Sequence, residues 1–275
     1  FLLPWLAQAH VSVEVVFEEG FARVYEIEEA PGHLPELIRV RSYPTLAEAQ
    51  FAAAQLPASD FTLKSMPAPL PTESGFLWPV TQEWSWEWER RYAAWIEGEV
   101  DENFFVKHQI STDCADVAVA LRWIFSRNNG LPGGFHLMGS GQFFHQDVVN
   151  EAWRALPQNA DWTKDERFMK SLRYVLRLTY THSLFKDSYP IEIKPTTFMA
   201  GAHHLGLGAE SGHTQLMAHI DISDNADTPL VVMYSTMPSE IRVLFRGEFI
   251  HSSAPDLKTT ALLRIRWPER QPEGN

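Results

Sequence analysis

The sequence predicts an α+β protein: a small N-terminal α+β domain, then a larger α+β domain in which a helix carries the cysteine and packs on an antiparallel sheet. Near the N-terminus, apolar and polar residues alternate as they do in strands. Around Cys114 the apolar residues follow helical spacing, and several further alternating segments occupy the C-terminal third. Helices followed by antiparallel strands are therefore expected in the larger domain.

The first nine residues are apolar and end in Ala7-Gln8-Ala9, the small-residue pattern of a signal-peptidase site. We interpret residues 1–9 as a signal-peptide remnant, which predicts His10 as the mature start and a periplasmic or secreted location. The alternative is an ordinary apolar end of a strand or helix. No apolar run reaches about 18 residues, so no membrane span is predicted.

Composition indicates a globular protein with a sizeable core. Of 275 residues, 45% are hydrophobic and 21% are charged, and the net charge is −12. Nucleic acids and anionic membranes are bound through basic patches, so this acidic balance argues against either as a partner. Cys114 is the only cysteine, which excludes an internal disulfide framework and, in an exported protein, suggests a reactive thiol.

Residues 10–65 are predicted to form the small α+β domain, interpreted as a packing or interaction module because it holds no recognisable binding motif. Its expected elements are strands at 11–17, 21–27 and 37–40, a capped Ala-rich helix at 45–56 and a short strand at 61–63. Residues 66–79 are rich in proline and predict a linker. The larger domain then spans residues 80–275.

The larger domain is expected to open with a helix over residues 84–96, whose aromatic side chains fall on one stripe. Such a stripe favours core packing, with stacking on sugars as the alternative. The glycine-rich stretch at 131–141 lacks the spacing of a phosphate loop and predicts a mobile loop. Further along, the pattern predicts a helix over 165–184 and strands at 191–193, 230–234, 241–245 and 262–267.

Cys114 is expected to open a helix, with Thr112 or Asp113 as its cap. In the first helical turn, unpaired backbone N–H groups and the helix dipole favour a thiolate. Asp113 and Asp116 oppose that effect, so a basic partner is needed to activate the sulfur. The alternative reading is that Cys114 is a small buried hydrophobic residue.

A strand over residues 211–221, entered through a glycine, supplies a candidate partner. One of its faces is predicted to carry Thr214 and Leu216, and the other His213 and Gln215. A cysteine that opens a helix and a histidine that opens a distant strand are the two halves of a Cys–His nucleophilic pair.

Gln109, Asp113-Cys114 at a helix start and Gly212-His213-Thr214 at a strand start resemble the papain-like cysteine hydrolases, and most of all their NlpC-type cell-wall amidase and endopeptidase branch. The resemblance implies that Cys114 attacks an amide carbonyl, His213 acts as the base and Gln109 helps to hold the oxyanion. It implies a peptide or peptidoglycan-like amide substrate and no cofactor. Two alternatives stay open: a transglutaminase-type acyl transferase, and a papain-like binding or scaffold protein of the cell envelope without turnover.

The third catalytic residue is sought from strand geometry. If residues 223–229 form a turn, antiparallel pairing places His213 opposite the 235–239 region. Asp221 lies eight residues along the strand from His213, roughly 26 Å away, too far to orient its ring. The candidates are therefore Ser235, Thr236 and Ser239, with Ser235 taken first, and each is weaker than the Asn, Asp or His usual at such sites.

Histidines in the C-terminal half also raise the question of a metal site. Their spacing matches no common zinc pattern, so no metal is predicted. The residues concerned are His203, His204, His213 and His219, with Asp221 as a possible fourth ligand.

Overall fold

The computed structural model describes residues 10–18, 21–29, 36–43, 75–138, 142–149, 151–194, 196–208, 212–220, 230–249 and 259–268. Several predictions fall outside these residues: the signal-peptide remnant at 1–9, the helix at 45–56, the strand at 61–63, most of the linker, and Asp221. We call the described residues from 75 to 268 the main body.

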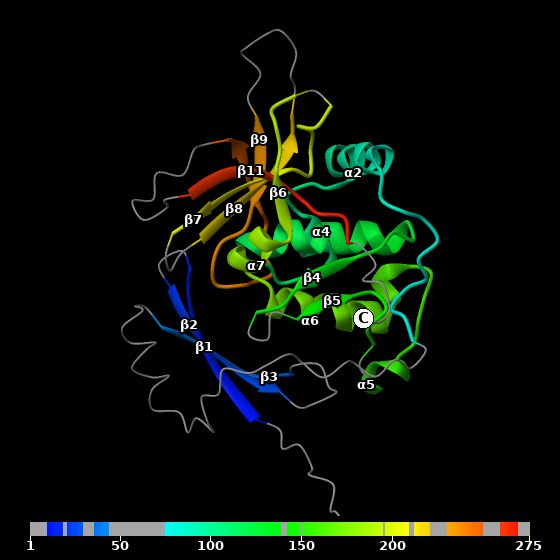
Figure 1. The fold of residues 1–275 in the computed structure, drawn as a ribbon, viewed down its shortest axis with the longest axis vertical. Coiled ribbons are helices and arrows are strands. Elements are labelled where there is room, and N and C mark those ends of the chain that lie inside the picture. Colours follow the sequence, from blue (N-terminus) through cyan, green and yellow to red (C-terminus); the bar gives the residue numbers. More distant parts are fainter. Residues whose placement is uncertain are drawn as a thin grey trace, which may run out of the picture.

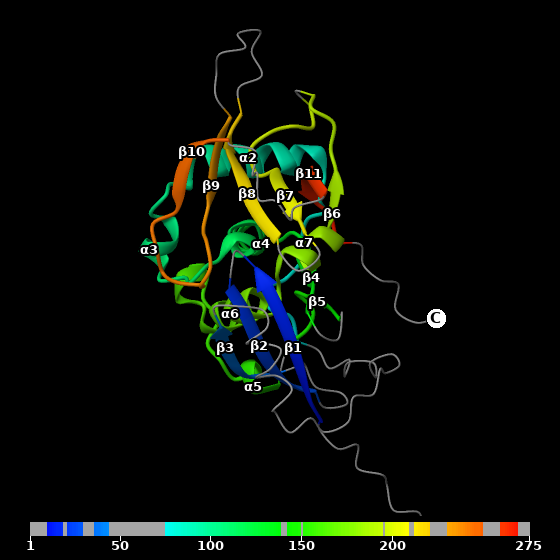
Figure 2. The same cartoon turned by 90° about the vertical axis from the view of Figure 1, so that its left-hand side faces the viewer.

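The N-terminal segment forms a three-stranded antiparallel sheet in the order β1-β2-β3. Its strands are β1 (His10–Glu18), β2 (Phe21–Glu29) and β3 (Glu36–Tyr43). The alternating pattern predicted all three strands, and each predicted range is a few residues shorter than the strand in the structure. Both views place this sheet, drawn in blue, below the six-stranded sheet of the main body (Figures 1 and 2).

Helices dominate the first half of the main body. In chain order the elements are α2 (Trp86–Glu99), α3 (Phe104–His108), α4 (Cys114–Asn128), β4 (Gly134–His136), β5 (Phe143–His145), α5 (Glu151–Arg154), the 3-10 turn η1 (Trp162–Lys164), α6 (Glu166–Leu178) and α7 (Thr181–Lys186). Among the residues that the structure describes, no helix is long and apolar enough to cross a bilayer.

Two predictions for this half of the main body need correction. The glycine-rich stretch at 131–141, expected to be a loop, contributes β4 to an antiparallel hairpin with β5. The single helix expected over 165–184 is two helices, because Thr179 adopts an extended conformation and its hydroxyl donates a hydrogen bond to the Val175 carbonyl at 2.9 Å. That bond satisfies one of the last free carbonyls of α6, at the residue where the backbone leaves the helix.

The second half forms a six-stranded sheet in which every neighbouring pair is antiparallel, in the order β10-β9-β8-β7-β11-β6. Its strands are β6 (Ser188–Pro190), β7 (His203–Leu207), β8 (Gly212–His219), β9 (Val231–Tyr234), β10 (Phe245–Glu248) and β11 (Thr259–Ile265). Helices followed by an antiparallel sheet are thus confirmed, and β7 is a strand that the pattern did not predict.

Two strands lie away from their predicted positions. The strand expected at 191–193 is β6, which ends at Pro190. The strand expected at 241–245 is β10, which begins only at Phe245. The chain before it forms backbone hydrogen bonds with the segments that connect α2, α3 and α4 instead. Glu240 forms a backbone bridge with Thr112, and the Leu244 N–H donates to the Glu102 carbonyl at 2.8 Å.

The sheet has two different faces. The main hydrophobic core lies between one face and the helices, and includes Leu216 and Met233 from the sheet and Leu121 from α4. A second, smaller cluster around Met217 and Val232 covers the other face. Figure 2 shows β8, β9 and β10 in front of α2 and α4, so the face turned to the viewer is the one without these helices.

The end of the predicted linker belongs to the core. Leu77 and Trp78 are buried, and the Trp78 indole N–H donates to the Leu131 carbonyl at 2.9 Å. Burial of these two large apolar side chains stabilises the folded state, whereas a flexible linker would leave them in solvent. The main body therefore includes residues that the proline-rich pattern assigned to the linker.

A buried ion cluster joins α2, α4 and β11. Glu89 is fully buried, and Arg122 donates two hydrogen bonds to its carboxylate, at 3.0 and 2.6 Å. Arg264 donates another, and the Trp267 indole one more at 2.7 Å. Burial works to raise the pKa of Glu89, but the attraction of Arg122 and then Arg264 brings that pKa below its ordinary value. The carboxylate stays ionised and connects three elements.

Glu89→Gln should lower the free energy of unfolding by roughly 3–5 kcal/mol, because Arg122 and Arg264 would be left as buried charges without their counter-ion. Urea denaturation followed by tryptophan fluorescence measures the change. The control is Glu87→Gln, an exposed glutamate on the same helix, whose unfolding midpoint should stay close to that of the parent. Similar losses in both variants would contradict the role given to Glu89.

Candidate functional site

Cys114 is the first residue of α4, and a capping box surrounds it. The Asp113 carboxylate accepts from the N–H groups of Ala115 and Asp116, and Asp116 accepts the Asp113 N–H at 2.9 Å. Cys114 itself is 0% exposed. The two carboxylates therefore use N–H groups that would otherwise stabilise a thiolate, and their charge disfavours one.

The start of α4 is tied to the chain that leaves β9. The Ser235 hydroxyl donates to the Thr112 carbonyl at 2.8 Å, and Ser239 donates to the carboxylates of the capping box. Strand alternation places Ser235 with Met233 on the face that α4 covers. Ser235, predicted to orient His213, thus gives its proton to the helix start.

His213 lies near the start of β8, as predicted. Its ring, however, lies on the sheet face opposite to the one that α4 covers. Its ring meets Tyr234 edge-on at 5.2 Å, and Tyr234 packs against the cluster around Met217. Alternation along the strand turns Thr214, not His213, toward α4. The fold thus brings the elements of Cys114 and His213 together, and places the imidazole on the face that α4 does not cover.

Gly212 explains the glycine before His213. A Cβ atom at this position would lie 2.2 Å from the Thr181 hydroxyl oxygen, at the start of α7. Only glycine allows β8 and α7 to approach so closely. The glycine of the Gly-His pair that the sequence offered as a catalytic signature is therefore explained by packing alone.

Gln109 is the C-cap of α3, with a left-handed backbone (φ 55°, ψ 44°). Its side-chain amide donates to the Val106 carbonyl of the same helix at 2.8 Å. An oxyanion donor has to be aimed at the reacting carbonyl before the reaction. In this conformation the Gln109 amide caps its own helix instead.

The histidines of β7 point in opposite directions. His203 pairs with Leu216 and is fully buried on the helix side, whereas His204 meets Phe249 at 5.0 Å on the other face. His219 lies at the exposed end of β8. Within the described part of the chain, no group of three or more His, Cys, Asp or Glu side chains could hold a metal ion.

His136 and Asp187 form a pair that the sequence did not predict. One carboxylate oxygen of Asp187, at the end of α7, lies 2.5 Å from His136 Nδ1, and the other accepts the His136 backbone N–H at 2.7 Å. This arrangement fixes the ring, and the Phe143 ring flanks it at 5.0 Å. The partners lie 51 residues apart on a short strand and a helix end, so no local pattern could have found them.

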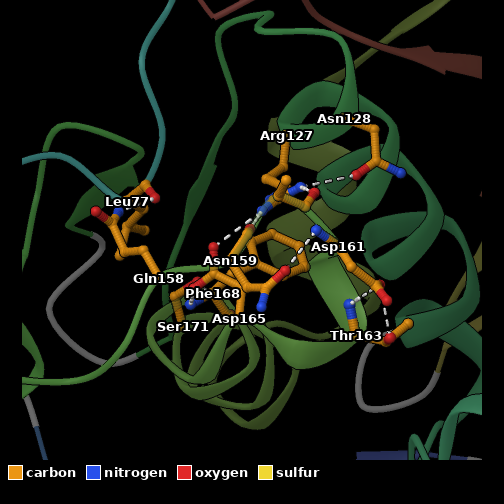
Figure 3. A network of polar contacts seen from close by, with 11 residues as sticks. Leu77, Arg127, Asn128, Gln158, Asn159, Asp161, Thr163, Asp165, Phe168 and Ser171 are labelled. Carbon is orange, nitrogen blue, oxygen red and sulfur yellow. Dashed lines mark hydrogen bonds and ion pairs between the residues drawn. The ribbon is translucent and has the colours of Figure 1, made fainter.

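An open groove of about 740 Å³ lies at the C-terminal end of α4. Figure 3 shows the polar network beside it. Arg127 donates to the Ala160 carbonyl at 2.8 Å, to the Asn159 carbonyl, and to the Asp165 carboxylate at 2.9 Å. Asp165 in turn caps α6 by accepting the Phe168 N–H. Arg127 thus fixes the loop before α6 against the end of α4.

The network has an exposed margin in Asp161, whose carboxylate accepts from the hydroxyl and N–H of Thr163 and pairs with Lys164. The Thr163 hydroxyl, followed by Lys164, lowers the pKa of Asp161 to about 2. This loop is therefore ordered by its own hydrogen bonds as well as by Arg127 (Figure 3).

His203 predicts a pH dependence of stability. Burial, followed by the positive charge of Arg264, lowers its pKa to about 3, whereas in the unfolded chain the ordinary value is about 6.5. Between these values only the unfolded chain binds the proton, so stability is full above pH 6.5 and falls as the pH drops toward 3. The slope is at most about 1.4 kcal/mol per pH unit.

His203→Gln should flatten this slope in urea titrations carried out between pH 6 and pH 4. His219→Gln is the control, because His219 is exposed and should leave the slope as it is in the parent. A parent protein whose stability does not change over this range, or equal slopes in parent and His203→Gln, would show that His203 is not buried in its neutral form.

A scan against protein-family models, a search of curated proteins and a search of solved structures found no match to this chain.

Proposed function

We propose that this chain is a binding protein of the cell envelope, periplasmic or secreted, in which Cys114 is a structural residue. The observation that carries this proposal is the combination of a fully buried Cys114 with an imidazole, that of His213, on the sheet face that α4 does not cover. A nucleophile and its base must come within hydrogen-bond reach, and the nucleophile must meet its substrate.

The surroundings of Cys114 support the proposal. Asp113 and Asp116 bring two negative charges to the first turn of α4, and the charge of a thiolate between them would be repelled. Gln109 and Ser235 use their donors for α3 and for the start of α4. Each of these contacts stabilises the fold.

A papain-like cysteine amidase is the second candidate, with a peptidoglycan-like peptide or a transglutaminase-type acyl donor as substrate. It is favoured by one specific observation: Cys114 begins a helix that packs on β8, the strand of His213. Activity would require the ring of His213 to leave Tyr234 and reach the other side of the strand.

Thiol reactivity separates the two candidates. In the native protein, iodoacetamide should label Cys114 at least about 100-fold more slowly than in urea-unfolded protein, because the reagent needs an exposed thiolate. The control is Lys186→Cys in a Cys114→Ala background. This new thiol lies on an exposed part of α7 and should react like free cysteine. Labelling of native Cys114 at pH 6.5 faster than free cysteine would overturn the binding proposal.

Incubation with muropeptides, read by mass spectrometry, should show no cleavage in parent, Cys114→Ala or His213→Ala protein. If cleavage is seen, the two variants decide its origin. A thiol hydrolase loses activity in both single variants, and the double variant is no worse, because residues that act as a unit lose their effect together.

A further inference from the structure

The groove at the end of α4 is a site apart from Cys114. Asn128, at the groove, and Cys114 are separated by the whole length of α4, roughly 20 Å along the axis. A volume of about 740 Å³ lies within the usual range of ligand pockets, about 300–1,000 Å³. The groove is therefore separate from the surroundings of Cys114 and large enough to hold a ligand.

Its walls are held in place before any ligand arrives. Arg127 fixes the Asn159–Ala160 backbone on one side. On another side, the N–H groups of Thr81 and Gln82 donate to the Gly130 carbonyl at 2.8 and 3.0 Å. Gly130 has a φ of +63°, and a Cβ there would lie 2.3 Å from the Thr81 hydroxyl oxygen, so only glycine fits. A prearranged site loses little entropy on binding.

Most polar side chains of the groove are uncharged. Among the described residues that line it, only Arg127 and Asp165 are charged, and they pair with each other at 2.9 Å. Other polar lining comes from amides and a hydroxyl, including Asn128 and Gln82, both exposed. The Asn128 amide oxygen accepts from Arg127 at 3.4 Å, so this side chain offers a ligand hydroxyl group its amide N–H donors. In Figure 3 the amide nitrogen of Asn128 points away from Arg127.

An aromatic ring lies beside these amides. Phe76 lines the groove and is 48% exposed, although burial of such a ring is normally favoured. Trp88 also lines the groove, but Arg91 lies over its ring at 4.6 Å. Phe76 is therefore the ring best placed to take the apolar face of a ligand.

We propose that this groove binds a neutral oligosaccharide, an inference that rests on the proposed binding function. A sugar ring has hydroxyl groups at its edge for the amides and a C–H face for Phe76. An anionic ligand would find Arg127 already neutralised by Asp165. A peptide adding to a sheet needs a strand edge, whereas these walls are a helix end and loops.

The test is isothermal titration calorimetry of the full chain with uncharged tetrasaccharides: β-linked N-acetylglucosamine, β-linked glucose and α-linked glucose. At least one should bind in the micromolar to millimolar range. Phe76→Ala and Asn128→Ala should each weaken that binding by about tenfold, as expected for the loss of one good contact. Phe185→Ala is the matched control, because Phe185 is 40% exposed on α7 and does not line the groove.

Three outcomes would overturn the inference: no binding of any of the three probes at millimolar concentration, binding that Phe76→Ala and Asn128→Ala leave unchanged, or preference for a uronate oligosaccharide, a nucleoside or a tripeptide tested in parallel. Unchanged melting temperatures in the variants exclude unfolding as the cause of a loss. Failure here with an unreactive Cys114 removes only the saccharide assignment. A reactive Cys114 with thiol-dependent cleavage removes the proposed function, whatever the groove binds.

Discussion

The buried carboxylate of Glu89 is the interaction on which the main body depends. It holds Arg122 of α4 and Arg264 of β11 at the point where helices and sheet meet. Removing three charges from water is costly, and only their mutual attraction and hydrogen bonds offset that cost. Two guanidinium groups around one carboxylate leave an excess positive charge, which agrees with the neutral state of the nearby His203.

The register of the six-stranded sheet has a consequence for the candidate site. Leu263 of β11 pairs with His203 of β7, and His203 pairs with Leu216 of β8. Leu263 and Leu216 both lie in the main core, so regular antiparallel pairing fixes which face of β8 meets the helices. A shift of one residue would exchange the two faces of β8 completely. With the observed register, Thr214 takes the position toward α4 and His213 meets Tyr234. The strand register therefore helps to decide which side chains lie toward Cys114.

Local periodicity predicted many of the helices and strands, but not how they pack against one another. The helix at Cys114 and the alternation of β8 were visible because each follows a single period over many residues. Alternation places Thr214 and Leu216 on one face of β8 and His213 and Gln215 on the other. Both faces carry buried side chains, so the pattern alone did not show which face meets the helices. Strand β10 was misplaced because Ile241 and Val243 alternate like a strand, yet are 46% and 52% exposed in a connection that hydrogen-bonds to the residues just before α3 and α4.

The groove and the contacts of Arg127 beside it could not be predicted from the sequence for a different reason. Arg127 reads as an ordinary basic residue in the last turn of a helix, where it would favour the helix dipole. Its partners Asn159, Ala160 and Asp165 lie more than 30 residues away in a loop without periodicity. Contacts of this kind depend on tertiary packing, and a single sequence contains no local signal for them.

A crystal structure of the protein grown with a neutral tetrasaccharide tests the account most directly. The account predicts sugar density in the groove, against Phe76 and Asn128, with the His213 ring against Tyr234 and Cys114 covered. Density at the start of α4 instead, with the imidazole of His213 within hydrogen-bond distance of the Cys114 sulfur, would contradict it and identify the thiol as the functional centre.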